Sequence, residues 1–177
     1  MAGAYPLEVR PGLRLELQHP DFATEYFALV AANLERLARW EPWATVPQSL
    51  SGIRTYLAWQ AQAFVARTQL PFVIVLDGRA VGSCTARLDA TEGTAEIGYW
   101  VGAAVEGTGV ASESIGALVA HVFARDTFRV QARTAVENGR SRTLLDRLGF
   151  AFEGVQRSAQ RMPGRRVDMA VYAKIAG

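Results

Sequence analysis

The sequence predicts one mixed α+β domain over residues 1–177. Short runs of apolar and β-branched residues alternate with longer segments whose apolar residues recur at helical spacing. No internal repeat and no low-complexity linker divides the chain. Half of the residues are hydrophobic and a fifth are charged, which is an ordinary composition for a globular protein with a single core.

The first half of the chain is predicted to contain two helices followed by a strand hairpin. Glu41-Pro42-Trp43 interrupts the helical pattern, because proline cannot continue a helix. Asp77-Gly78 is typical of a two-residue hairpin turn. The expected elements are a strand over 13–17, helices over 21–40 and 51–66, and strands over 72–76 and 80–87.

The second half is predicted to begin with a strand that carries Glu96 and Tyr99, after a turn at Glu92-Gly93. Apolar residues at helical spacing from Ala111 to Val122 then predict a helix. The remaining expected elements are a strand over 128–136, a helix over 140–148, and a hairpin that pairs 153–160 with 167–175 around Pro163-Gly164.

A glycine-rich turn between the strand and the helix is the main functional motif. The strand Ile97-Gly98-Tyr99-Trp100-Val101 leads into Glu106-Gly107-Thr108-Gly109-Val110-Ala111. Glycines before a helix let the backbone approach a ligand closely, and the first N–H groups of the helix are free to bind an anion. We therefore expect the backbone of Gly107, Thr108, Gly109, Val110 and Ala111 to bind a phosphate group.

A second motif, Asn138-Gly139-Arg140-Ser141, lies one helix and one strand downstream and is followed by Leu144, Gly149 and Phe150. The two motifs in this order resemble the GNAT superfamily of N-acetyltransferases. Gly109 and Ala111 match its pyrophosphate turn, and Asn138 and Ser141 match its downstream cofactor motif. The resemblance implies acetyl-CoA as co-substrate and a GNAT-like fold, with a central, mixed, mostly antiparallel sheet flanked by helices.

Two positions depart from the family pattern. Glu106 stands where the family usually has glutamine or arginine. An acidic side chain there would repel a pyrophosphate, so Glu106 is expected to turn toward solvent. Leu145 stands where many relatives have the tyrosine that protonates the departing thiolate, so that acid is absent.

Three further segments resemble the ribosomal-protein N-terminal acetyltransferases within this superfamily. They are the aromatic-rich break over 37–43, the strand end over 98–101, and the hairpin segment over 164–168. This resemblance implies transfer of acetyl to the α-amine of a protein or peptide by direct attack in a ternary complex. Two alternatives remain open: a small amine acceptor such as an amino acid or an antibiotic, and a non-catalytic acyl-CoA-binding module.

Acetyl transfer to an amine requires a base, because free amines are largely protonated near pH 7. Glu96 is the candidate, since it shares a strand face with Gly98 and Trp100; the alternative is a solvent-facing glutamate. The family resemblance implies that backbone N–H groups near Trp100 and Val101 stabilise the developing negative charge. Ser141 either hydrogen-bonds the sulfur or caps a helix.

Trp40, Trp43 and Tyr99 are the candidates for contacting the acceptor, although aromatic residues at helix breaks are more often part of a core. Cys84, His19 and His121 lack partners at metal-ligand spacing, so they are interpreted as structural and no metal is expected.

The remaining features define where the protein is expected to act. A net charge of +2 does not indicate nucleic-acid or membrane binding. The sequence shows no secretory signal and only one cysteine, which predicts a cytoplasmic location without disulfides. A homodimer is left open.

Overall fold

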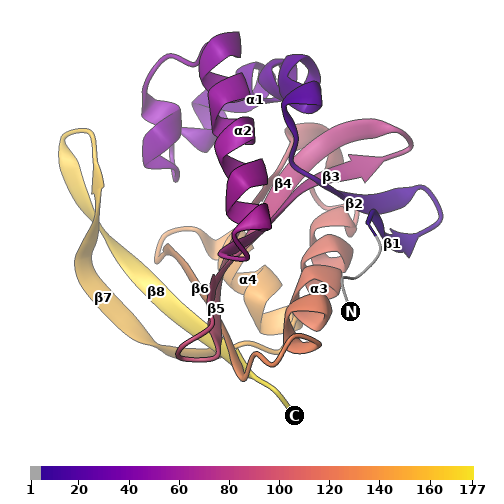
Figure 1. Ribbon diagram of the computed structural model, residues 1–177. Coiled ribbons are helices and arrows are strands. Elements are labelled where there is room, and N and C mark those ends of the chain that lie inside the picture. The colour runs from indigo at the N-terminus through magenta and orange to yellow at the C-terminus, as the bar shows by residue number, and fades with distance from the viewer. Residues whose placement is uncertain (1–4) are drawn as a thin grey trace.

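The computed structural model describes residues 5–177, which form an eight-stranded sheet with helices on both faces (Figure 1). The strand order is β1-β2-β3-β4-β5-β6-β8-β7, and only the β5–β6 pair is parallel. The strands are β1 (Leu7–Arg10), β2 (Leu13–Leu17), β3 (Gln69–Leu76), β4 (Arg79–Asp89), β5 (Thr94–Val101), β6 (Arg129–Ala135), β7 (Ala151–Met162) and β8 (Arg165–Ile175). The helices are η1 (Pro20–Phe22), α1 (Ala23–Leu37), η2 (Pro42–Thr45), α2 (Leu50–Val65), η3 (Ala103–Val105), α3 (Val110–Phe123) and α4 (Gly139–Arg147).

The predicted mixed α+β fold is confirmed, and every expected element is present with small changes at its ends. The expected helix over 21–40 is shorter, because the backbone N–H groups of Trp40 and Glu41 both donate to the Leu37 carbonyl and turn the chain. Strand β1 was not predicted. It is only four residues long, which is too short for its alternating pattern to stand out.

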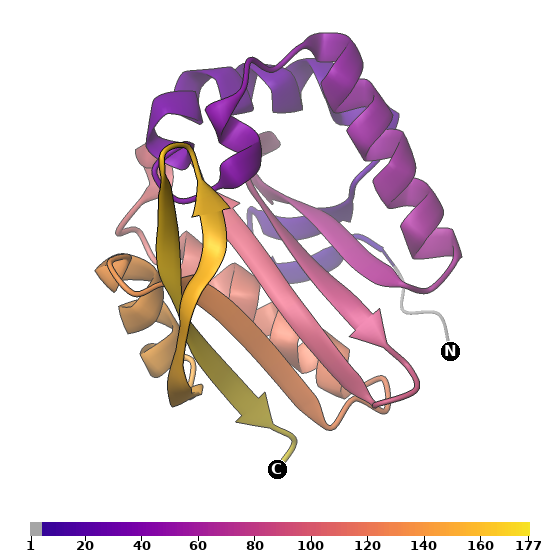
Figure 2. The ribbon, with the colours of Figure 1, turned by 90° about the vertical axis from the view of Figure 1, so that its left-hand side faces the viewer.

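Two hydrophobic layers hold the helices against the sheet. Helix α3 packs on one face through Ile115 and Leu118, and α4 joins this core through Leu145. Helices α1 and α2 pack on the opposite face, where Val30 and Leu57 meet residues of β3. Figure 2 shows that α1 and α2 gather at one end of the sheet and leave much of the same face over β5 and β6 without a helix in front of it.

The parallel pair β5–β6 comes apart halfway along its length. Pairing runs from Thr94↔Arg129 to Ile97↔Ala132 and then stops, although β5 continues to Val101 and β6 to Ala135. We refer to the unpaired halves, residues 98–101 and 133–135, as the splay. Their backbone polar groups that point across the splay have no strand partner there.

The C-terminal hairpin β7–β8 extends from the sheet to the loop between α1 and α2 (Figures 1 and 2). The Gln160 side-chain amide donates to the backbone carbonyl of Trp40 at 2.8 Å. The Trp40 ring packs beside a small buried cluster that includes Met162 and Met169. Residues 120 positions apart therefore lie together beside the splay.

Candidate active site

The glycine turn, residues 106–111, has the conformation that anion binding requires. Gly107 and Gly109 have φ angles of +77° and +90°, in the left-handed region that favours glycine. Gly109 is the N-cap of α3 and brings no side-chain hydrogen bond, so the first N–H groups of the helix are not capped by it. A Cβ added at Gly107 would meet open space within 4 Å. A pyrophosphate can therefore approach the backbone here.

The pairing of β5 with β4 determines which backbone N–H groups of β5 point toward the splay. In antiparallel pairing, opposite residues alternate between pairs that exchange hydrogen bonds and pairs that do not. The Gly102 N–H donates to the Val81 carbonyl at 2.7 Å, and the β4–β5 register has no shift. Trp100 therefore exchanges its bonds with Ser83, whereas the N–H groups of Tyr99 and Val101 point toward the splay. Of the two residues expected to offer an N–H group, the geometry selects Val101.

Glu106 does not turn toward solvent as expected. Its two carboxylate oxygens pair with the guanidinium groups of Arg36 from α1 and Arg140 from α4. Arg36 also donates to the Val101 carbonyl, and so ties the end of α1 to the end of β5. The ion pairs explain the correction: two arginines from distant elements neutralise the carboxylate beside the glycine turn.

Asn138 and Ser141 lie at the start of α4, across the splay from β5. The Tyr99 side chain of β5 reaches Ser141 from the other side. The Asn138 side chain caps α4 by accepting from the Ser141 N–H at 3.2 Å. The Ser141 hydroxyl lies 2.9 Å from the Tyr99 hydroxyl. Burial raises the pKa of Tyr99 to about 12, so the phenol keeps its proton across the physiological range. These hydroxyls form a neutral donor–acceptor pair on the α3/α4 side of the sheet.

Trp100 points to the other side, because successive residues of a strand alternate between faces. Its ring packs edge-on against Tyr26, with centroids 5.8 Å apart, and lies 6.4 Å from the Trp43 ring. We refer to the sheet face that carries Glu96, Gly98 and Trp100 as the acceptor face. Trp43 borders this face, while Tyr99, also expected to contact the acceptor, points away from it toward Ser141.

Glu96 lies on the acceptor face beside the last paired residues of β5 and β6. Its Oε1 atom accepts from Arg87 at 2.9 Å and from Arg133 at 3.1 Å, and its Oε2 atom accepts from Gln131 at 3.1 Å. Most of the acceptor capacity of Oε1 is therefore taken up by arginine donors, whereas Oε2 accepts a single hydrogen bond.

Glu41, which the sequence analysis did not single out, lies at the aromatic edge of the acceptor face. The Trp43 indole N–H donates to its Oε2 atom at 3.1 Å. Burial raises the pKa of the Glu41 carboxyl group, and the hydrogen bond from Trp43 offsets part of the rise. The signal available in the sequence was the acidic residue inside the aromatic break over 37–43, but its burial depends on residues far along the chain.

The residues interpreted as structural are placed accordingly. Cys84 is fully buried in β4, and burial raises its pKa, so its thiol stays protonated. His121 hydrogen-bonds Tyr5 at 3.1 Å and packs among aromatic rings. Within residues 5–177, no group of three or more acidic, histidine or cysteine side chains is arranged to hold a metal ion. In the same range, no helix combines the length and apolar character needed to span a membrane.

Comparison with known proteins identifies the family. A model of the acetyltransferase (GNAT) domain matches residues 14–151. The provisionally named ribosomal N-acetyltransferase YdaF of Bacillus subtilis (strain 168) is 27% identical over 96% of this chain and 94% of its own. The ribosomal-protein-serine acetyltransferase of Escherichia coli (strain K12) is 24% identical, with 96% of each chain covered. The crystal structure of the microcin C7 self-immunity acetyltransferase MccE, in complex with acetyl-CoA and AMP, superimposes with a TM-score of 0.94 at 22% identity, covering 98% of each chain.

The chain belongs to the GNAT family of acetyl-CoA-dependent N-acetyltransferases. Within it, the chain is a distant homologue of the ribosomal-protein-serine acetyltransferase of Escherichia coli. The resemblance inferred from the two sequence motifs is therefore confirmed, and the alternative of a non-catalytic module is set aside.

Proposed function

We propose that this enzyme transfers acetyl from acetyl-CoA to the N-terminal α-amine of a protein or peptide. The observation that carries the proposal is the two-sided exposure of β5 at the splay. Tyr99 points toward Ser141 and the glycine turn, and Trp100 points toward the acceptor face, so two substrates can reach one strand from opposite sides. The named functions of its relatives support a protein N-terminus as the acceptor.

The backbone of residues 107–111 is assigned to the pyrophosphate, and Asn138 and Ser141 to the arm of the cofactor. When bound, acetyl-CoA supplies an activated acetyl thioester. We assign the Val101 N–H as the donor to the carbonyl oxygen of the thioester, on which negative charge develops during transfer. A donor that the strand already holds in place needs no reorganisation. The neutral hydroxyls of Ser141 and Tyr99 can donate to a departing sulfur.

Removal of the amine proton falls to one of two carboxylates on the acceptor face. Glu96 is one candidate, but both of its oxygens are already engaged by donors. Glu41 accepts one hydrogen bond, from Trp43, and a raised pKa strengthens its carboxylate as a proton acceptor. We propose Glu41 as the base, with Glu96 as the alternative.

An acceptor panel tests the proposed function. Thiol release from acetyl-CoA is measured with short peptides bearing a free N-terminus, the same peptides with a blocked N-terminus and one internal lysine, free amino acids, and an aminoglycoside. An α-amine has a pKa of about 8 against about 10.4 for lysine, so the free peptides should react far faster near pH 7. Turnover confined to amino acids or the aminoglycoside would assign a small-molecule acceptor instead.

A further inference from the structure

We propose that Arg87 and Arg133 select an acceptor with a carboxylate close to its amine, namely a peptide whose second or third residue is acidic. This inference rests on the proposed function, because it assigns the substrate class of that same acceptor face. Its basis is a pair of guanidinium groups held next to the splay with hydrogen-bond donors to spare.

The two arginines come from different strands and converge on one carboxylate. Arg87 of β4 stands opposite Glu96 of β5 in the register, and Arg133 of β6 lies directly after the last β5–β6 pair. Both donate to the same Glu96 oxygen, at 2.9 Å and 3.1 Å. Glu96 therefore holds the two guanidinium groups together and acts as a positioning residue for them.

This pairing leaves donors exposed. Arg87 uses one of its nitrogens on Glu96, and its side chain is 62% exposed. Arg133 uses two of its nitrogens, and its side chain is 40% exposed. A guanidinium group carries five N–H donors in a planar fork that matches a carboxylate. The unused donors can bind a second carboxylate, one that arrives with the acceptor.

The other carboxylates near this part of the acceptor face are already engaged. Asp89, further along β4, accepts from the backbone N–H groups of Thr91 and Glu92 and so caps a turn. Glu153 of β7 is paired with Arg129 at the far end of β6. Arg87 and Arg133 carry two positive charges against the single negative charge of Glu96, the carboxylate they share, which favours an anionic ligand.

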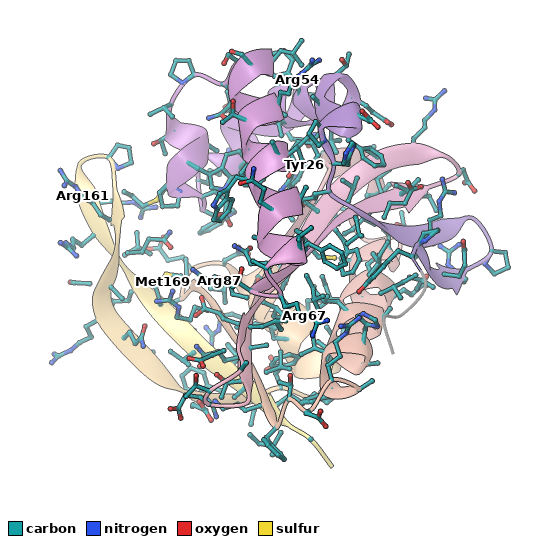
Figure 3. The ribbon with its side chains drawn as sticks, in the orientation of Figure 1. Tyr26, Arg54, Arg67, Arg87, Arg161 and Met169 are labelled. Atoms are coloured by element: carbon teal, nitrogen blue, oxygen red, sulfur yellow. The ribbon has the colours of Figure 1, made fainter. Side chains whose placement is uncertain are left out.

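The position of this pair limits where the acidic group of the acceptor can lie. Figure 3 labels Arg87 and Met169, which lie in the region between α2 and the β7–β8 hairpin. Arg133 adjoins the point where the splay begins, and the amine must reach the thioester beside Val101, four residues beyond the last pair on β5. Because one extended residue spans about 3.3 Å, the carboxylate must belong to one of the first few residues after that amine.

The test compares three C-terminally amidated peptides, Ala-Glu-Ala-Ala, Ala-Gln-Ala-Ala and Ala-Lys-Ala-Ala, in steady-state acetylation at low salt. We expect kcat/KM for the glutamate peptide to exceed that of the glutamine peptide by about tenfold, mainly through KM, since a charge-assisted hydrogen bond is stronger than a neutral one. The lysine peptide should be the poorest. Raising the salt concentration should reduce the preference, because these groups are partly exposed.

Variants then assign the preference to the arginine pair. Arg133→Gln and Arg87→Gln should each reduce the preference for glutamate over glutamine severalfold, through a higher KM for the glutamate peptide. Arg129→Gln is the matched control, because Arg129 is also an ion-paired arginine of β6 but lies at its far end. It should leave the preference intact.

Two results would overturn the inference in different ways. Equal kcat/KM for the three peptides with the unaltered enzyme, or an equal loss for all three in Arg133→Gln, would show that the enzyme acetylates peptides without reading an acidic residue. No transfer to any of the three, with transfer to a small amine, would instead overturn the proposed function and the inference with it.

Discussion

The two sides of β5 differ in the chemical groups that they present to a substrate. On the α3/α4 side the site consists mainly of backbone groups and short hydroxyls, fixed by left-handed glycines and a helix cap. On the acceptor face it consists of long charged and aromatic side chains from the α1–α2 connection, which contains η2, and from β4, β5 and β6. Backbone groups bind what is common to all acyl-CoA molecules, whereas side chains can differ between acceptors. The following substitutions test that division of labour.

The largest effect is expected from Glu41→Gln. Loss of a general base should lower kcat by about 100-fold and flatten its rise with pH. Glu96→Gln is the matched comparison and should retain the pH-dependent rise if Glu41 is the base. A flattened profile in Glu96→Gln, with a normal profile in Glu41→Gln, would reverse the assignment.

The same Glu41→Gln variant has a separate consequence for stability. Burial raises the pKa of Glu41 in the folded state, so the ionised form is less favourable there than in the unfolded chain. The unaltered protein should therefore lose stability relative to the variant as the pH rises from 4.5 through the raised pKa. Thermal unfolding at a series of pH values measures this. A stability difference that does not change with pH would contradict the burial of this charge.

Next in size is Gly107→Ala, compared with Gly164→Ala in the β7–β8 turn. Both glycines have positive φ angles, +77° and +72°, with no atom within 4 Å of an added Cβ. Each substitution should cost about 1–2 kcal/mol of stability through backbone strain. Only Gly107→Ala should weaken acetyl-CoA binding, by about 30-fold, because a turn that relaxes away from the left-handed conformation no longer directs its N–H groups at the pyrophosphate.

Thermal shift with acetyl-CoA separates the two glycine variants. A ligand at one hundred times its dissociation constant stabilises a protein by about 2.7 kcal/mol. At one fixed concentration, the Gly164→Ala protein should keep the full shift and the Gly107→Ala protein should lose most of it. Equal shifts in the two variants would remove the glycine turn from the cofactor site.

A smaller effect is expected from Ser141→Ala. It removes a neutral hydroxyl that hydrogen-bonds Tyr99, so kcat should fall by about fivefold, within the usual range for one such bond. Tyr99→Phe is the companion variant. If the hydroxyls act as a pair, the double variant should show about the same loss as either single variant. If the fold loss in kcat of the double variant equals the product of the two single losses, the two hydroxyls act independently.

The smallest effect is expected from Glu106→Gln, which removes the negative charge next to the glycine turn and releases Arg36 and Arg140. Acetyl-CoA should then bind about threefold more tightly, since partly exposed ion pairs contribute up to about 1 kcal/mol. Arg140→Gln should weaken binding by a similar factor. Isothermal titration measures both, and weaker binding in Glu106→Gln would show that the ion pairs matter more for the shape of the turn.

The sequence predicted the backbone conformations on the α3/α4 side of the site better than the side-chain contacts on the acceptor face. The glycine turn follows from local chemistry, because left-handed glycines act within a few residues. The cap of α4 is equally local, but Asn138 provides it rather than Ser141, the residue expected as a cap. The alternation that places Glu96 and Trp100 on one face follows from strand geometry. These features need no knowledge of distant contacts.

The features that the sequence analysis missed depend on distant partners. Glu106 meets Arg36 across 70 positions, so its single-residue context suggested only repulsion from a phosphate. Glu41 bonds its near neighbour Trp43, but the Trp43 ring lies beside Trp100, which is 57 positions further along the chain. The engagement of Glu96 requires Arg133, 37 positions away on a neighbouring strand. Periodicity and local propensity contain no information about such pairs.

The alternation along β5 also constrains how enzymes of this kind can diversify. Under the proposed function, substitutions at positions 96, 98 and 100 change the surface that faces the amine, while Ile97 stays in the core and Tyr99 stays beside Ser141. The insertion or deletion of one residue within 96–100 would exchange the two sets, because a shift by one reverses every side chain. New acceptor preferences are therefore accessible through point changes in this strand, whereas changes in its length would disrupt both binding surfaces together.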